Sequence, residues 1–117
     1  MLKKVSFNFN GRRITVNAKE CNNFERILGL MFKSKNKAEA LLFSFNKPVN
    51  LGIHSFFVFF PFVAVWLDEE DNAIDVKEIK PFTMSAEAKR PYRKLLEIPM
   101  NEQYRKKLDF SSVIRKI

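Results

Sequence analysis

The sequence contains few of the residues on which disulfides, metal sites and phosphate loops depend: one cysteine, one histidine and three glycines. Cys21 alone cannot form a disulfide within the chain, so nothing indicates an oxidising compartment. A zinc site takes three or four cysteine, histidine or carboxylate ligands, and one cysteine with one histidine is too few. Phosphate-binding loops are rich in glycine, and three glycines in all provide none. We therefore predict no metal and no cofactor.

The amino terminus lacks the apolar run of a secretory signal. Residues 1–8 carry charge, and no hydrophobic segment follows them. Together with the lone cysteine, this predicts a cytoplasmic protein. The length of 117 residues fits a single domain over 1–117 with one hydrophobic core. The 13 phenylalanines favour β-strands, in which aromatic side chains pack well.

The longest apolar stretch runs from Leu51 to Asp68 and contains the only histidine and the only tryptophan of the chain. A transmembrane helix needs about 20 apolar residues, whereas this stretch is interrupted by Pro61 and contains His54. The proline divides it into residues 53–60 and 62–67, each of ordinary strand length. We therefore predict two buried strands bent at Pro61, and we expect no membrane partner.

Turn signals and alternating hydrophobicity predict the other strands. Asn10-Gly11 separates two alternating stretches and predicts a hairpin of residues 3–8 and 12–16. Residues 62–79 predict a second hairpin. Further strands are predicted at 40–45, closed by Asn46-Lys47-Pro48, at 92–98 and at 112–117. Helical spacing and potential caps predict two short helices, at about 22–32 and 101–108.

Charge is unevenly distributed in a chain whose formal net charge is +8. Residues 68–79 contain six carboxylates and one lysine, whereas residues 89–117 contain nine basic and three acidic residues. A solvated basic face is the simpler interpretation. The alternative is a nucleic-acid interface, ideally with Tyr92 or Tyr104 exposed for base stacking. Its candidate residues are Lys89, Arg90, Arg93, Lys94, Arg105, Lys106 and Lys107.

Five stretches, in this order, resemble the domain of unknown function 192 family. They are Arg26-Ile27-Leu28-Gly29-Leu30-Met31-Phe32, Ala40-Leu41-Leu42-Phe43, Ile53-His54-Ser55-Phe56-Phe57 with Phe60-Pro61, Leu67-Asp68, and Leu95-Leu96-Glu97-Ile98-Pro99. The resemblance covers nearly the whole chain. It implies a compact, mainly β, mostly antiparallel domain, barrel-like or a sandwich, with one or two short helices. It implies no established biochemical activity.

The chain departs from the family pattern at three positions. The family commonly has Met-Arg where this chain has Val58-Phe59, and an aspartate at the position of Val63. A buried ion pair replaced by well-packed apolar residues is often neutral or stabilising. The resemblance therefore suggests that Phe59 and Val63 jointly replace an ion pair of the family.

Three polar residues lie among apolar strand residues and are the candidate ligand contacts: His54, Ser55 and Glu97. On a strand over 53–60, alternation would place Ser55 with Ile53, Phe57 and Phe59 on one face and His54 on the other. Ser55 could then not serve His54 as a nucleophile. A distant Ser44, Ser111 or Ser112 is geometrically possible, as is a Cys21–His54 dyad, but no sequence pattern supports either. We predict no catalytic residues.

Two functional classes remain open, with a third behind them. The first is a non-enzymatic module that binds a small ligand or a protein, which predicts a concave pocket or an exposed aromatic patch near residues 54–60. The second is nucleic-acid binding by the basic carboxy-terminal third. The third is a small enzyme that uses His54.

Overall fold

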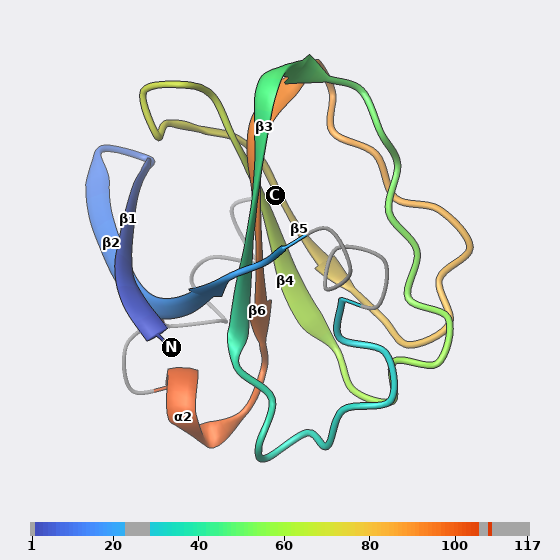
Figure 1. Cartoon of the computed structure of the whole chain (residues 1–117). Helices are drawn as coiled ribbons and strands as arrows, with labels where there is room; N and C mark the ends of the chain where they lie inside the picture. Colours follow the sequence, from blue (N-terminus) through green and yellow to red (C-terminus); the bar gives the residue numbers. More distant parts are fainter. Residues whose placement is uncertain (1, 23–28, 106–107, 109–117) are drawn as a thin grey trace.

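The computed structural model describes residues 2–22, 29–105 and 108. It contains a six-stranded sheet of order β1-β2-β3-β6-β4-β5 (Figure 1). The strands are β1 (Leu2–Phe9), β2 (Arg12–Glu20), β3 (Ala40–Val49), β4 (Phe62–Leu67), β5 (Ala73–Ile79) and β6 (Tyr92–Pro99), followed by the helix α2 (Glu102–Arg105). Every strand pair in this sheet is antiparallel except β2–β3. The mainly β, mostly antiparallel fold is thereby confirmed.

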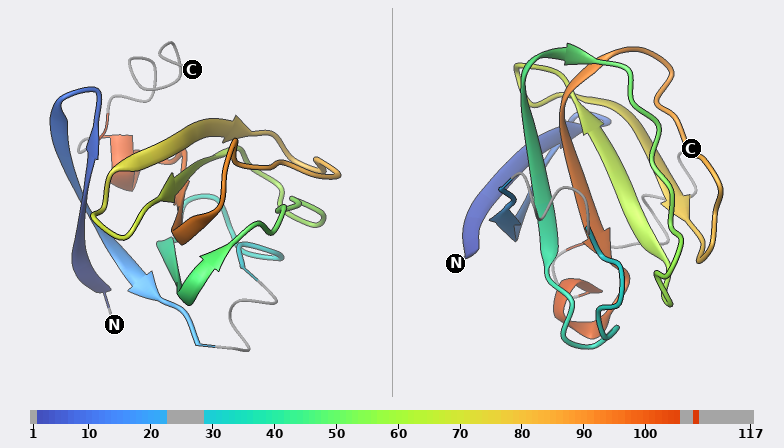
Figure 2. Two further views of the ribbon diagram at one scale, coloured as in Figure 1. Left: turned by 90° about the horizontal axis from the view of Figure 1, so that it is seen from above. Right: turned by 45° about the vertical axis from the view of Figure 1, so that its right-hand side comes forward.

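The sheet curls into a half-barrel, which is seen from above in Figure 2. Its two edge strands approach one another at one end only, where Asn8 in β1 meets the turn before β5. The Asn8 backbone N–H donates to the Asp71 carbonyl at 2.8 Å, and the Asn8 side chain donates to the Asn72 side-chain oxygen at 3.0 Å. The barrel-like alternative is thus correct, with an incomplete closure.

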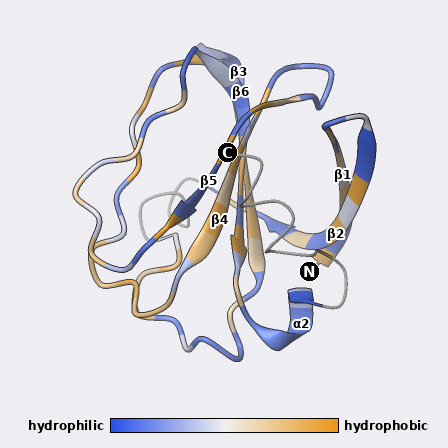
Figure 3. Cartoon of the chain, turned by 180° about the vertical axis from the view of Figure 1, so that it is seen from behind, coloured by the Kyte–Doolittle hydropathy of each residue, from blue (hydrophilic) through white to orange (hydrophobic). Residues whose placement is uncertain are grey.

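Both faces of the central strands are buried, which explains why β4 is hydrophobic along its length (Figure 3). Val63, Val65 and Leu67 face the interior of the curl, together with residues of β1 and β2. Phe62, Ala64 and Trp66 point to the outer face, where residues of two loops pack over them. Alternation therefore serves two cores rather than a core and a solvent face.

Several sequence predictions hold in detail. Asn10 and Gly11 both have positive φ, 51° and 75°, as a type I′ hairpin turn requires. The second hairpin is β4–β5, and the strand predicted at 92–98 is β6. The second predicted helix is present as α2. Most of the first predicted helix, the end of the second and the strand predicted at 112–117 lie outside the described residues, and residues 29–32 form turns.

The strand predicted at 40–45 is longer than expected. It continues as β3 to Val49, through Asn46, Lys47 and Pro48. The pairing of β3 with β6 shifts between Ser44 and Val49, so these three residues lie at the irregularity of the ladder. A proline is tolerated at such a bulge, where its missing N–H costs no ladder hydrogen bond.

The strand predicted at 53–60 is wrong. These residues form a loop, in which Ile53 makes a single bridge to Ala86. Burial does not alternate: Ser55, Val58 and Phe60 are buried, whereas Phe56 and Phe57 are exposed. Phe57 and the likewise exposed Phe59 pack on aromatic rings of neighbouring loops instead of on a sheet, which propensity alone does not distinguish.

The proposed replacement of a family ion pair by Phe59 and Val63 is also wrong. Phe59 is 61% exposed, whereas Val63 is fully buried in the interior of the half-barrel. The two side chains lie in different environments and do not substitute for a contacting pair. No helix among the described residues is long and apolar enough to cross a membrane. The cytoplasmic location stays a prediction.

Candidate ligand pocket

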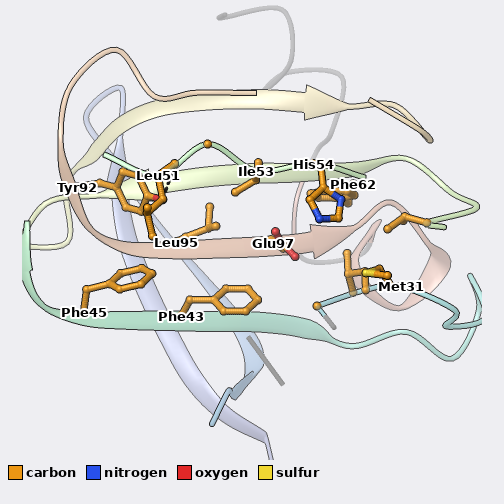
Figure 4. Close-up of a pocket in the computed structure, with 14 residues that line it drawn as sticks. Met31, Phe43, Phe45, Leu51, Ile53, His54, Phe62, Tyr92, Leu95 and Glu97 are labelled. Atoms are coloured by element: carbon orange, nitrogen blue, oxygen red, sulfur yellow. Dashed lines mark hydrogen bonds between the residues drawn. The ribbon is translucent and has the colours of Figure 1, made fainter. Parts of the chain in front are cut away.

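A pocket with a volume of about 270 Å³ lies between the outer face of the sheet and the loops that cover it (Figure 4). Strands β3, β4 and β6 form its floor, and residues 29–31 and 51–58 contribute its walls. The lining is mainly apolar. It consists of Gly29, Leu30, Met31, Phe43, Phe45, Leu51, Gly52, Ile53, His54, Val58, Phe62, Tyr92, Leu95 and Glu97.

Glu97 is the only carboxyl group of this lining. On β6, Leu96 and Ile98 face the interior of the half-barrel, so alternation turns Leu95 and Glu97 to the outer face. There the Cα atom of Glu97 pairs across the sheet with those of Leu41 and Ala64, both fully or almost fully buried. Glu97 is therefore a polar residue among the apolar side chains on the outer face of the sheet.

The Glu97 carboxyl group is buried without a polar partner. The residue is 7% exposed, and no hydrogen bond joins its side chain to any of the described residues. Burial raises its pKa to about 8, because desolvation penalises the charged form. At pH 7 the group is therefore mainly the neutral acid, which offers one O–H donor and acceptor oxygens to the cavity.

Tyr92 closes the other end of the pocket. Its hydroxyl donates to the Leu51 carbonyl at 2.8 Å, and its ring meets the Phe45 ring edge-on at 5.9 Å. Burial, and next the charge of Glu97, raise the pKa of Tyr92 to about 12. Tyr92 is therefore a fixed, neutral wall whose hydroxyl is already occupied.

His54 lines the same pocket as Glu97 (Figure 4). Its Nδ1 accepts the Phe56 backbone N–H at 3.2 Å, and its ring leans on the Phe56 ring at 5.2 Å. Because Nδ1 accepts this hydrogen bond, a neutral His54 carries its proton on Nε2. The residue is exposed and lies at the solvent side of the lining.

Ser55 does not line the pocket. Its side chain is fully buried, and its hydroxyl donates to the Lys80 carbonyl and accepts the Thr83 backbone N–H, both at 2.6 Å. Backbone hydrogen bonds between Ser55 and residues 82 and 83 complete this connection between two loops. The structure thus brings two of the three predicted ligand residues together, and the third fixes the loop that carries His54.

The predicted nucleic-acid residues occupy separate places. Arg93 and Lys94 lie at the start of β6 and pair with Glu69 at 3.2 Å and Asp71 at 2.8 Å. Arg105 lies beyond the other end of β6, on α2, and pairs with Glu102 at 3.6 Å (Figure 1). Lys89 and Arg90 are exposed in the loop before β6, and Lys106 and Lys107 lie outside the described residues. Tyr92 and Tyr104, expected to be exposed for stacking, are both 2% exposed.

Sequence reasoning missed most of the apolar lining. Leu30, Met31 and Leu51 come from loops, where no periodic pattern marks a shared face. The glycine at position 29 was the one signal in the sequence, because glycine readily adopts positive φ. In the structure Gly29 has a φ of +53°, and the chain there passes close to the Glu97 carboxyl group. Within the part of the chain that the structure describes, no three histidine, cysteine, aspartate or glutamate side chains gather to hold a metal ion.

A family model matches residues 5–115, and it is that of domain of unknown function 192, described as an uncharacterized ACR. The chain belongs to this family. The match covers the half-barrel and the pocket, and it agrees with the resemblance found in the sequence. The family description names no activity. A comparison with curated proteins finds no match.

Two solved structures share the fold. One is a protein of unknown function from Novosphingobium aromaticivorans, with a TM-score of 0.72 and 16% identity over 90% of this chain and 77% of that one. The other, from Sinorhizobium meliloti, is described as a proposed transcription regulator, with a TM-score of 0.68 and 14% identity over 80% of this chain and 76% of that one. At such identities the similarity is one of fold.

Proposed function

We propose that this member of the domain of unknown function 192 family is a non-enzymatic ligand-binding domain. It holds a small, mainly apolar molecule with one uncharged polar head group in the pocket between the sheet and the loops. The observation that supports this is the Glu97 carboxyl group, which is buried in the mainly apolar lining and forms no hydrogen bond with the described residues. A buried polar group is normally hydrogen-bonded, so an uncharged polar group of a ligand would be a suitable partner for this carboxyl group.

The pocket volume limits the size of the ligand. A dry protein cavity of about 150 Å³ binds benzene, so the 270 Å³ found here suits a molecule somewhat larger than one ring. Phe43, Phe45 and Leu95 offer dispersion contacts to the body of such a molecule. The head group would lie against Glu97, and the body toward Tyr92.

The protonation of Glu97 selects the head group. A carboxylate ligand would face an acid that can donate only one proton, and its own charge would be desolvated in a lining that contains no lysine or arginine. An amine would need Glu97 to ionise in an apolar site, at a cost in desolvation that attraction to the amine only partly offsets. An amide, ketone or hydroxyl matches a neutral acid without burying charge.

Three probes with the same ring and different heads test this choice: benzamide, benzylamine and benzoate. Titration followed by amide chemical shifts should give saturable binding for benzamide, with shifts at residues of the pocket lining. Benzylamine and benzoate should bind at least about tenfold more weakly, the equivalent of about 1.4 kcal/mol. Equal shifts for all three, or shifts spread over the surface, would argue against the proposal.

The direction in which affinity changes with pH shows which form of Glu97 binds the ligand. If the neutral acid is the binding form, affinity for benzamide stays constant below the pKa of about 8 and falls above it as Glu97 ionises. In Glu97→Gln the side chain at position 97 is a neutral amide at every pH. Binding of benzamide should therefore persist, and its pH dependence should disappear. Glu70→Gln, at an exposed residue of the turn after β4, is the matched control and should behave as the unaltered chain.

Nucleic-acid binding is a second candidate, supported by the net charge of +8 and by the description of the structural neighbour from Sinorhizobium meliloti. It ranks lower because Arg93, Lys94 and Arg105 each already pair with a carboxylate. Fluorescence anisotropy with short DNA and RNA duplexes at two salt concentrations tests it, since phosphate contacts weaken steeply with salt.

Turnover that depends on His54 ranks third, and loss of any such activity in His54→Ala would test it.

A further inference from the structure

Four exposed phenylalanines form a cluster on three loops of the described chain: Phe32, Phe57, Phe59 and Phe82, exposed by 66, 47, 61 and 48%. The rings touch one another. Phe32 stacks on Phe57 at 5.1 Å, and Phe82 meets Phe57 and Phe59 edge-on at 6.2 and 5.5 Å. Contiguous exposed aromatic surface of this kind on a protein commonly marks an interaction site.

The backbone holds three of these rings outward at a cost. Phe32, Phe57 and Phe82 have φ values of 62°, 60° and 59°, in the left-handed region that a bulky residue rarely adopts. Hydrogen bonds maintain the conformation: the Phe32 N–H donates to the Phe57 carbonyl, and the Phe82 N–H donates to the Ser55 carbonyl, both at 2.9 Å. Strained residues that the surrounding structure maintains concentrate at functional positions.

The loops that carry the cluster are rich in basic residues. The three loops that carry the rings, residues 29–39, 50–61 and 80–91, contain six lysines and arginines against Glu39 and Glu87, and Lys33, Lys35, Lys37 and Lys80 lie within five residues of a phenylalanine of the cluster. All four lysines are exposed. None of them forms an ion pair with a carboxylate of the described residues, in contrast to the paired Arg93 and Lys94.

We infer that the phenylalanine cluster and its four lysines form a contact surface for an anionic lipid bilayer. The rings would insert at the level of the head groups, and the lysines would contact anionic lipids, as aromatic and basic residues do at membrane interfaces. Residues 51–68 do not suit a spanning helix, which is why no membrane partner is predicted from the sequence, but a surface contact needs no spanning segment. A second copy of the chain fits less well, because it would bring two sets of unpaired lysines together.

Flotation with lipid vesicles tests the inference. The chain should float with vesicles of mixed phosphatidylcholine and phosphatidylglycerol and remain unbound with phosphatidylcholine alone. Each lysine near an anionic surface contributes roughly fivefold to the partition constant, so added salt should release the protein. Absence of binding to the mixed vesicles at low salt would overturn the inference.

Two double variants separate the contributions of the rings and the charges. F57N/F82N removes two rings and places asparagine, which tolerates positive φ, at both positions, so the fold should be retained. It should lower partitioning at least tenfold. K33Q/K80Q should lower it more than K4Q/K47Q, which removes the same charge from exposed positions on β1 and β3. Unchanged partitioning of F57N/F82N would contradict the inference.

Two further measurements address other occupants. Light scattering after size exclusion shows whether the chain forms a dimer that F57N/F82N dissociates, which would assign the surface to self-association instead. Binding to soluble polyglutamate that depends on Phe57 and Phe82, with no binding to vesicles, would assign it to an acidic protein. Either result would overturn the lipid assignment.

Discussion

Glu97 makes the stability of the protein depend on pH in a direction opposite to that of a salt-bridged carboxylate. Its pKa is about 8 in the folded chain and about 4.5 when unfolded, so between these values the folded state holds more protons at this site. The free energy of unfolding contributed by Glu97 is then fully present below pH 4.5 and falls as pH rises toward 8.

Glu97→Gln should remove this dependence. Glutamine is nearly isosteric with the neutral acid, so the two chains should be about equally stable near pH 4.5. Near pH 8 the variant should be more stable by a few kcal/mol, at most about 4. Urea denaturation at several pH values measures the difference. Parallel stability curves for the two chains would show that Glu97 is ionised or solvated in the folded state.

Ser55 is a second buried polar residue, and its role is structural. Its hydroxyl satisfies one carbonyl and one N–H in a buried position, and Ser55→Ala leaves both without this partner. The expected loss is about 1–3 kcal/mol of unfolding free energy. Hydrogen exchange at the Thr83 amide should accelerate as well, whereas Ser85→Ala, at an exposed serine of the same loop, should change neither quantity. An unaffected Thr83 amide would argue against the connection.

At the scale of elements, the sequence predicted what periodicity determines and failed where loop packing decides. The Asn10-Gly11 turn requires positive φ, and the alternation of β1, β2 and β5 is local, so these elements could be read directly. Residues 53–60 have strand composition, yet their apolar side chains are divided between the outer core and the phenylalanine cluster. The pocket escaped prediction for the same reason: Glu97 was recognisable as a polar strand residue, but its burial under residues 29–31 and 51–58 is tertiary.

Phe56 and Phe60 discriminate between the loop and the predicted strand. On a strand they would share a face, whereas in the structure Phe60 is 1% and Phe56 38% exposed. Phe60→Ala should lower the free energy of unfolding by about 3–5 kcal/mol, as for other buried phenylalanines. Phe56→Ala should cost about 1 kcal/mol or less. Similar losses in thermal or urea unfolding would favour the strand.

At the scale of the whole molecule, the β1–β2 hairpin is joined to the rest of the sheet by few backbone pairings, although its apolar side chains pack in the interior core. The parallel pairing of β2 with β3 spans Ala18–Glu20 only, and the opposite edge meets β5 through Asn8 and Asn72. Tyr104 reinforces the junction: its hydroxyl accepts the Ala40 N–H at 2.7 Å and donates to the Asn17 carbonyl at 3.0 Å. This residue, 87 positions from Asn17, connects α2 to both strands of the parallel pair. No local pattern in the sequence predicts such a contact.

Tyr104→Phe should therefore loosen the hairpin specifically. Both hydrogen bonds disappear, and the buried Ala40 N–H loses this partner, so the free energy of unfolding should fall by about 1–3 kcal/mol. Amide exchange in β1 and β2 should accelerate more than in β4 and β6, because the junction opens before the sheet as a whole unfolds. Tyr92→Phe is the control, since its hydroxyl binds the Leu51 carbonyl away from the hairpin. If both variants accelerate amide exchange equally in all strands, the half-barrel opens as one cooperative unit, and Tyr104 does not stabilise the hairpin specifically.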